Sequence, residues 1–284
     1  MNRRLSPLFR VASAALLLPC LVSAPHARGE GPTAAASAAF NAYSKAVESR
    51  LAEQHRSPDS FLALSHPERE TARLQAGAFV IEQITPPQGA DLPGAMLHHW
   101  RGTAFAPGAT ASDFVRLMQN YNAYPRNFAP DVLQAKSLTP PGNHMQAWMR
   151  VRQQHVITVV MDTTYDVTFG QLDPQHGYSI SRSTRIDEIA SPGTASEHVL
   201  TPGEEHGFLW RLDTYWSYEE RDGGLYLQIE TVSLTRSIPL GLGWVIGPYV
   251  ESVPRESLEF TLRAACNALK NPSHNTSLRK ASSR

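Results

Sequence analysis

The sequence predicts an α+β fold in which a curved antiparallel sheet wraps around a long C-terminal helix, with extra helices at the N-terminus. Eight runs between positions 78 and 236 have the composition and alternation of β-strands, and one helical segment interrupts them. After Pro239 the apolar residues change to helical spacing, which continues to residue 270. A sheet with an apolar face needs a cover, and this last segment is the long amphipathic helix that follows it.

The first 28 residues have the layout of a secretory signal peptide. Arg3, Arg4 and Arg10 precede an apolar run from Val11 to Val22, and small residues come after the run. The run is shorter than the roughly 20 residues that cross a bilayer. We therefore expect residues 1–28 to be removed and the mature protein to be periplasmic or secreted.

The two cysteines bear on this expectation. Cys20 leaves the alternative of a lipid anchor, which is disfavoured because Pro19 stands where such sites carry a small residue. Once the signal segment is removed only Cys266 remains, so an intrachain disulfide is not expected.

The charge balance restricts the partners. Lys and Arg total 26 and Asp and Glu total 26, so the formal net charge is zero. Nucleic-acid binders usually carry a strong basic excess, so we expect no nucleic-acid partner.

Residues 29–74 are expected to form a linker and N-terminal helices. Residues 29–39 are rich in Ala, Gly, Pro and Ser, as linkers are, and Phe40, Tyr43, Val47 and Leu51 then follow helical spacing. A second short helix is expected from Ser57-Pro58 to Leu64. The globular domain is placed at residues 75–270, and the polar tail at 271–284 is expected to be disordered.

Within the domain, strands are expected at residues 78–84, 96–105, 132–138, 144–153, 156–169, 178–189, 207–218 and 225–236. One helix is expected between the strands at 96–105 and 132–138. Thr110, with Asp113 three residues later, is expected to cap it, and Pro125 is expected to end it. Pro254 is expected to kink or restart the C-terminal helix.

The last two strands allow a register to be predicted. Asp222-Gly223 is a strong hairpin signal, and it pairs Trp216 with Ile229, Thr214 with Thr231, and Tyr215 with Glu230. One face of this pair is then largely apolar, and we place the C-terminal helix across it. Its members are Phe208, Trp210, Leu212, Thr214, Trp216, Leu227, Ile229 and Thr231.

The order of segments resembles the START/polyketide cyclase-like (SRPBCC) superfamily, whose fold is the helix grip. The likeness covers Gln75 to Lys270, and its most specific part is Tyr121–Pro125 followed by Pro130–Val132. Residues 208–210 and 254–258 also look like those of exported bacterial members of unknown function. The resemblance implies a ligand cavity between the sheet and the last helix. It implies no particular chemistry, because the superfamily includes carriers, cyclases and regulatory domains.

Candidate ligand-binding residues follow from these faces. The aromatic ones are Trp100, Trp210, Trp216, Trp244 and Tyr249, and Ile229 adds apolar surface. Thr214 and Thr231 face the same side and offer hydroxyl groups. Plain core packing is the alternative interpretation of all of these residues.

His98 and Arg182 are the candidates that can be charged. His98 is expected to face inward with Trp100, while the neighbouring His99 faces outward. Arg182 is a candidate clamp for a ligand carboxylate, and alternation places it on the same strand face as Glu188 and opposite Arg185. A structural role for both residues is the alternative.

The sequence contains no nucleophile elbow, His-Glu-x-x-His, paired cysteine ligands or phosphate loop, so no catalytic residue, cofactor or metal is assigned. The leading hypothesis is an exported monomeric binder or carrier of a lipid-like or other apolar small molecule. The apolar segment at residues 238–244 suggests transient membrane contact. The alternatives are a cyclase- or dehydratase-type enzyme that uses His98 or Arg182, and a structural or partner-binding protein with a filled core.

Overall fold

A computed structural model describes residues 31–84, 92–154, 158–201, 203–237 and 243–270, without the side chains of residues 243–252. The expected signal segment and the C-terminal tail lie outside the described residues, as does most of the apolar segment at 238–244.

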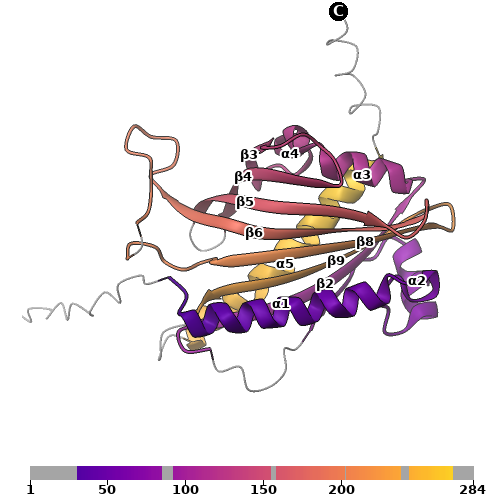
Figure 1. The fold of residues 1–284 in the computed structure, drawn as a ribbon, viewed down its shortest axis with the longest axis horizontal. Helices are drawn as coiled ribbons and strands as arrows, with labels where there is room; N and C mark the ends of the chain where they lie inside the picture. Colours follow the sequence, from indigo (N-terminus) through magenta and orange to yellow (C-terminus); the bar gives the residue numbers. More distant parts are fainter. Residues whose placement is uncertain (1–30, 85–91, 155–157, 202, 238–242, 271–284) are drawn as a thin grey trace, which may run out of the picture.

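One antiparallel sheet forms the centre of the fold, with the strand order β1-β2-β9-β8-β6-β5-β4-β3 and with β7 paired to β6 (Figure 1). All eight strand runs expected from the sequence are present, and β7 is an additional two-residue strand. The strands are β1 (Val80–Gln83), β2 (Ala95–Pro107), β3 (Val132–Ser137), β4 (His144–Gln154), β5 (Thr158–Gln171), β6 (His176–Ala190), β7 (His198–Val199), β8 (Arg211–Arg221) and β9 (Gly224–Arg236).

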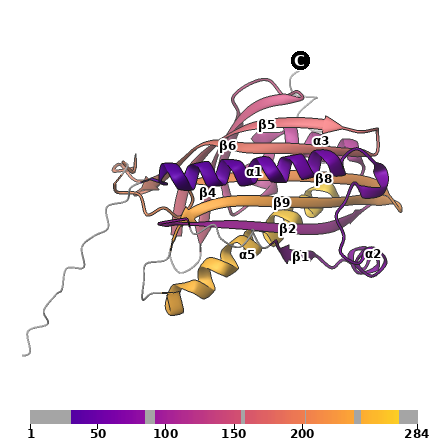
Figure 2. The same ribbon diagram turned by 60° about the horizontal axis from the view of Figure 1, so that its bottom comes forward.

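Two long helices lie on opposite faces of this sheet (Figures 1 and 2). Helix α5 (Gly243–Lys270) crosses what we call the inner face, and α1 (Ala34–Gln54) lies along the outer face. Each face has its own apolar cluster, one including Leu258 and Leu262 of α5 and the other including Phe40 of α1. The α+β helix-grip arrangement expected from the sequence is therefore confirmed, with a second helical layer on the outside.

Helix α1 begins earlier than the sequence analysis expected. The side chain of Thr33 accepts a hydrogen bond from the backbone N–H of Ala36 at 3.0 Å and caps a helix that starts at Ala34. Part of the expected linker is therefore helical, because an alanine-rich segment with an N-cap has high helix propensity. The buried positions Phe40, Val47 and Leu51 are the ones that the spacing predicted.

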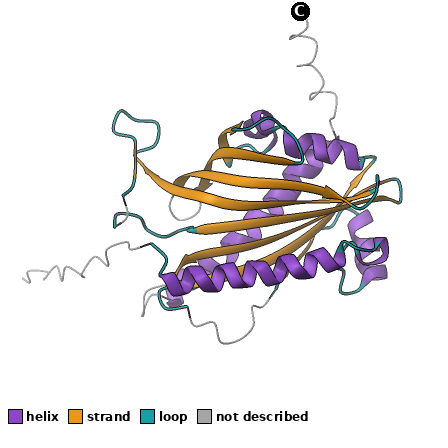
Figure 3. Cartoon of the chain, viewed as in Figure 1, coloured by secondary structure: helices purple, strands orange, loops and turns teal. Residues whose placement is uncertain are grey.

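Two other boundaries differ from expectation. The helix expected from Ser57 to Leu64 is only one turn, η1 (Pro58–Ser60), and α2 (Pro67–Gln75) follows it (Figure 3). Helix α3 (Ala111–Gln119) has the expected capping box but ends before Pro125. After η2 (Tyr121–Ala123), Pro125 lies in the first turn of α4 (Tyr124–Asn127), where proline is tolerated because that N–H needs no helical partner.

The β8–β9 hairpin has the predicted register. Trp216 pairs with Ile229, Thr214 with Thr231, and Tyr215 with Glu230. The turn has two residues, Asp222 and Gly223, and both have positive φ angles of 56° and 73°, which suits the twist of a tight hairpin. Side chains therefore alternate between the inner and outer faces along both strands.

Candidate functional site

Six of the candidate residues share the inner face of the sheet, as the alternation predicted: His98, Trp100, Thr214, Trp216, Ile229 and Thr231. The strand pairing connects them, since Trp100 lies opposite Thr231, which in turn lies opposite Thr214. Ser181 continues this row onto β6, where it pairs with Thr214. Four neighbouring strands thus contribute one row of side chains that can form hydrogen bonds, on a face that is otherwise mainly apolar.

This row differs in burial from the neighbouring inner-facing row, which contains the paired residues Trp216 and Ile229. Trp216 is 2% exposed, and its ring lies edge-on to that of Phe114 with the centroids 5.2 Å apart. Ile229 is equally buried. Thr214 and Thr231, one step further along the same strands, are only half-buried. Trp216 and Ile229 therefore belong to a packed core, whereas solvent reaches the two threonines on the inner face.

Trp100 is the residue of this row whose hydrogen bonding is incomplete. Its side chain is buried, with 8% of the residue exposed, and its indole Nε1–H has no hydrogen-bond partner in the described part of the chain. The hydroxyl of Ser179, on the next inner-facing position of β6, is also buried without a partner there. A buried donor without an acceptor is costly, so such groups often mark a position where a partner binds.

His98 faces inward, as expected. The residue is buried, and its Nε2 lies 3.1 Å from the Thr235 hydroxyl oxygen, so the ring is held by a neighbouring strand. His99 faces outward, and the two histidines belong to different environments.

Arg182 does not belong to the inner face, which corrects its interpretation as a clamp for a ligand there. Its Nε donates to Glu48 Oε1 of α1 at 2.6 Å, and 43% of its side chain is exposed. The pairing of β5 with β6 shifts at Thr164 and Tyr165, so residue 184 is extra and the alternation changes. Arg182 and Arg185 therefore share the outer face, opposite to Glu188.

The structure also corrects the expected position of Trp210, which does not belong to the inner face. Its ring packs with the outer apolar cluster beneath α1, and the Arg236 guanidinium lies 5.9 Å from its centroid. Strand β8 begins only at Arg211, and the backbone before it is bent, so strand alternation does not apply to Trp210. The side chains of Trp244 and Tyr249 lie outside the described part of α5, and their role stays a prediction.

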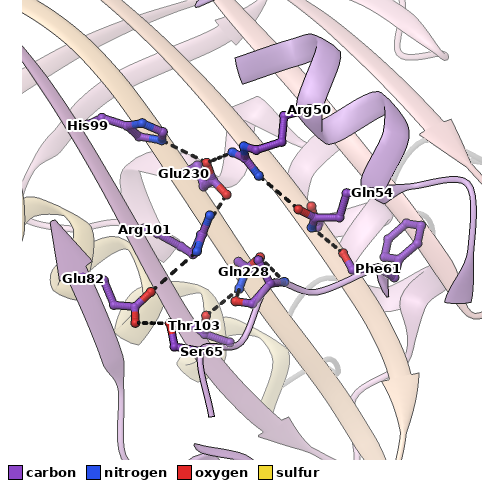
Figure 4. Close-up of polar contacts among 12 residues, drawn as sticks. Arg50, Gln54, Phe61, Ser65, Glu82, His99, Arg101, Thr103, Gln228 and Glu230 are labelled. Carbon is purple, nitrogen blue, oxygen red and sulfur yellow. Dashed lines mark hydrogen bonds and ion pairs between the residues drawn. The ribbon is translucent and has the colours of Figure 1, made fainter. Parts of the chain in front are cut away.

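The outer face carries a buried charged network that the sequence analysis did not find (Figure 4). Glu230 of β9 accepts hydrogen bonds from His99 Nε2 at 2.9 Å and Arg101 Nε at 2.8 Å, and it is also paired with Arg50 of α1. Burial alone would raise the pKa of Glu230, but the hydrogen bond from His99 and the charges of Arg101 and Arg50 lower it to about 2. The tyrosine hydroxyl of Tyr43 lies 2.9 Å from the other nitrogen of His99.

Strand alternation alone could have grouped His99 and Arg101 with Glu230. Arg50 could not have been assigned, because it depends on how α1 docks. The network is therefore a structural connection between α1 and the sheet, in which each charged group has a partner.

A pocket of about 220 Å³ lies on the same outer side, between the second half of α1 and strands β6 and β8. Its walls include Glu48 of α1 and the C-cap residue His55, with Tyr178 and Tyr215 of the sheet, and Leu172 contributes apolar surface. The ring of His55 stacks between Phe61 and Tyr178, and burial lowers its pKa to about 4. Ser179 and Trp216 of the sheet also line this pocket, so one residue that the sequence assigned to the ligand site, Trp216, borders it as well.

The described residues contain no cluster of three or more His, Cys, Asp or Glu side chains arranged to hold a metal ion. Among the helices described, none combines the length and apolar character that crossing a membrane requires. Cys266 is a buried free thiol of α5, and burial raises its pKa to about 11.

No protein-family model and no curated protein matches this chain. Its fold is similar to that of several solved structures. A fragment of a STAR-related lipid transfer protein from Xanthomonas axonopodis is 18% identical, with 67% of this chain and 98% of that chain covered and a TM-score of 0.41. Human STARD10 is 8% identical, with 77% and 86% covered and a TM-score of 0.44.

The Zhui aromatase/cyclase from Streptomyces sp. R1128 is 14% identical, with 62% of this chain and 95% of that chain covered and a TM-score of 0.40. Each of these three matches has a TM-score below 0.5, so the resemblance to START-like and polyketide cyclase-like proteins stays one of segment order and architecture.

Proposed function

We propose that this protein binds or carries a lipid-like or other apolar small molecule on the inner face of its sheet, beneath α5. The observation that supports this most directly is the row of Trp100, Thr231, Thr214 and Ser181. Its threonines are half-buried, and its indole N–H is buried without a partner. Ligand sites commonly combine an apolar surface with a few polar groups that orient the ligand.

Different groups of the proposed site supply the binding free energy and the selection of the ligand. Apolar surface removed from water by a ligand supplies the binding free energy, at roughly 25 cal/mol per Å². The hydroxyl and indole groups add little affinity, but they penalise a ligand that leaves them without a partner. Both requirements are met by a mainly apolar molecule with a small polar part.

The remaining features of the proposal rest on the sequence. Residues 1–28 support export to the periplasm or beyond, and the apolar segment at 238–244 supports transient contact with a membrane from which a lipid is taken. A monomer is the proposed state of the mature protein.

The test begins with the mature protein, residues 29–284, purified without detergent and examined by native mass spectrometry for co-purified apolar molecules. Thermal melts with and without a bacterial lipid extract then measure ligand-induced stabilisation, because a ligand that binds the native state raises its stability. We expect bound lipid and a raised melting temperature. Absence of both would overturn the proposal and favour a protein with a filled core.

A double variant locates the site. Thr214→Val with Thr231→Val removes both hydroxyls but keeps the side-chain shape, and we expect it to reduce the stabilisation by the extract. Thr184→Val, on an exposed position of β6, is the matched control and should leave the stabilisation unchanged. An equal response of both variants would place the ligand elsewhere, and the outer pocket would then be the next region to test.

A further inference from the structure

We infer that the ligand of the inner face is uncharged and presents an oxygen acceptor, such as an ester, ketone or alcohol, to the indole N–H of Trp100. This inference rests on the proposed function and specifies its ligand class. It makes Trp100 the residue that selects among apolar molecules.

The indole of Trp100 determines which chemical group can be its partner. An indole Nε1–H is a donor only, so its missing partner has to be an acceptor. The residue is more than nine-tenths buried, and no described side chain or backbone group accepts from it. A hydrocarbon ligand would leave this donor unsatisfied, whereas a ligand oxygen would satisfy it.

The position of Trp100 relative to α5 follows from a close contact of this helix with β2. A Cβ atom at the inner-facing Gly102 would overlap Leu258 Cδ2 and would lie 2.7 Å from Leu262 Cδ1, so the helix approaches β2 closely there. Figures 1 and 2 show α5 beginning at the end of the sheet where β2 also begins. Trp100, two residues before Gly102, therefore lies on the side of this contact that faces the first half of α5.

An anionic ligand would require a cationic partner on the inner face. The described inner-facing positions of β2, β6, β8 and β9 contain no Lys or Arg. The Lys and Arg side chains described on α5, from residue 253 onward, are exposed. In the sequence, residues 238–252 also contain neither Lys nor Arg.

The acidic and basic side chains described at the inward-facing positions of these strands have partners. Glu188 accepts from the backbone N–H groups of His206, Gly207 and Phe208, and Glu220 accepts from the backbone N–H of Ala111. His98 lies two residues before Trp100 on the same face of β2 and contacts Thr235. A buried carboxylate or phosphate without a cationic partner is strongly disfavoured, so a neutral ligand is favoured over a fatty acid or phospholipid head group.

The experiment uses four ten-carbon probes on the mature protein at pH 7.5: methyl decanoate, decan-1-ol, n-decane and sodium decanoate. Isothermal calorimetry or native mass spectrometry gives their relative affinities. We expect the ester and the alcohol to bind about fivefold or more tightly than the alkane, because one satisfied hydrogen bond separates them. Decanoate should bind more weakly than the ester.

Trp100→Phe keeps an aromatic ring and removes the donor. It should reduce the affinity for the ester and alcohol to that for the alkane, and leave the affinity for the alkane within about twofold. Trp210→Phe is the matched control, because the Nε1 of Trp210 is also buried without a partner in the described structure but lies on the outer side. It should not change the order of the four probes. If Trp100→Phe does not fold, Thr231→Val beside it provides the second variant and should weaken the ester and alcohol selectively.

The outcomes separate this inference from the proposed function. Tighter binding of decanoate than of the ester, or an ester preference that survives in Trp100→Phe, overturns the inference while the apolar site stands. Failure of all four probes to bind overturns both.

Discussion

The Arg50 guanidinium on α1 pairs with the buried carboxylate of Glu230 on β9, across 180 positions of the sequence. This contact connects the outer helix to the middle of the sheet. Because His99 and Arg101 of β2 share the same carboxylate, one side chain of β9 links a helix and a neighbouring strand.

Replacement of this carboxylate should be strongly destabilising. In Glu230→Gln Arg50 loses its counter-charge and Arg101 keeps only its longer pair with Glu82 at 3.6 Å. Breaking a buried ion pair on one side typically costs about 3 to 5 kcal/mol of unfolding free energy. Chemical denaturation followed by circular dichroism measures the loss. Glu53→Gln removes a carboxylate of α1 whose pair with Arg56 is largely exposed, so it should cost less than about 0.5 kcal/mol. Similar losses for the two variants would contradict the structural role of Glu230.

Stability should fall with decreasing pH in two successive, slightly overlapping windows. The pKa of His55 is lowered from 6.5 to about 4, so the unfolded chain binds a proton that the folded chain does not, and stability decreases as the pH falls from 6.5 to 4. The pKa of Glu230 is lowered from 4.5 to about 2, so its contribution is complete above pH 4.5 and is lost as the pH falls towards 2.

Melting temperatures across this range test the assignment. His55→Phe keeps the ring stack and should flatten the dependence between pH 6.5 and 4, while the lower window remains. Glu230→Gln should flatten the dependence between pH 4.5 and 2, while the upper window remains. An unchanged profile in either variant would show that another group titrates in that window.

Gly102 should be a position that tolerates no side chain. In Gly102→Ala the added Cβ meets Leu258 and Leu262, so α5 or its leucines have to move, and overpacking of this kind costs about 1 to 3 kcal/mol. Gly142→Ala, where the nearest atom to a Cβ is 3.9 Å away, is the control and should be close to neutral. Thermal melts of both variants compare them directly, and equal melting temperatures would argue against the close contact of α5 with β2.

Trp216 should behave as a core residue. Trp216→Ala removes a ring that is 2% exposed and packed against Phe114, so we expect a loss of about 3 to 5 kcal/mol. Trp148→Ala removes the half-buried ring over which the Lys136 ammonium lies, and it should cost clearly less. Urea unfolding of the two variants gives the difference. A loss below about 1.5 kcal/mol for Trp216→Ala would indicate unfilled space beside the ring.

The sequence by itself determined the strand order along the chain, the capped helix at Thr110 and the register of the last hairpin. Local chemistry encodes these features: alternation gives the strands, a side-chain oxygen gives the helix start, and Asp222-Gly223 gives the turn whose length sets the pairing. The inward placement of His98, Trp100, Thr214 and Thr231 follows from the same alternation.

Only the tertiary structure decided what covers each face. The bulge in β6 reversed the alternation beyond Thr184, so Arg185 rather than Glu188 shares the outer face with Arg182, and the bend before β8 moved Trp210 to the outer side; neither irregularity has a local sequence signal. The docking of α1 brought Arg50 to Glu230 through contacts between residues far apart in the chain, which periodicity cannot reveal. Burial distinguished the packed Trp216 from the half-buried threonines beside it, because burial depends on the side chains of several elements at once.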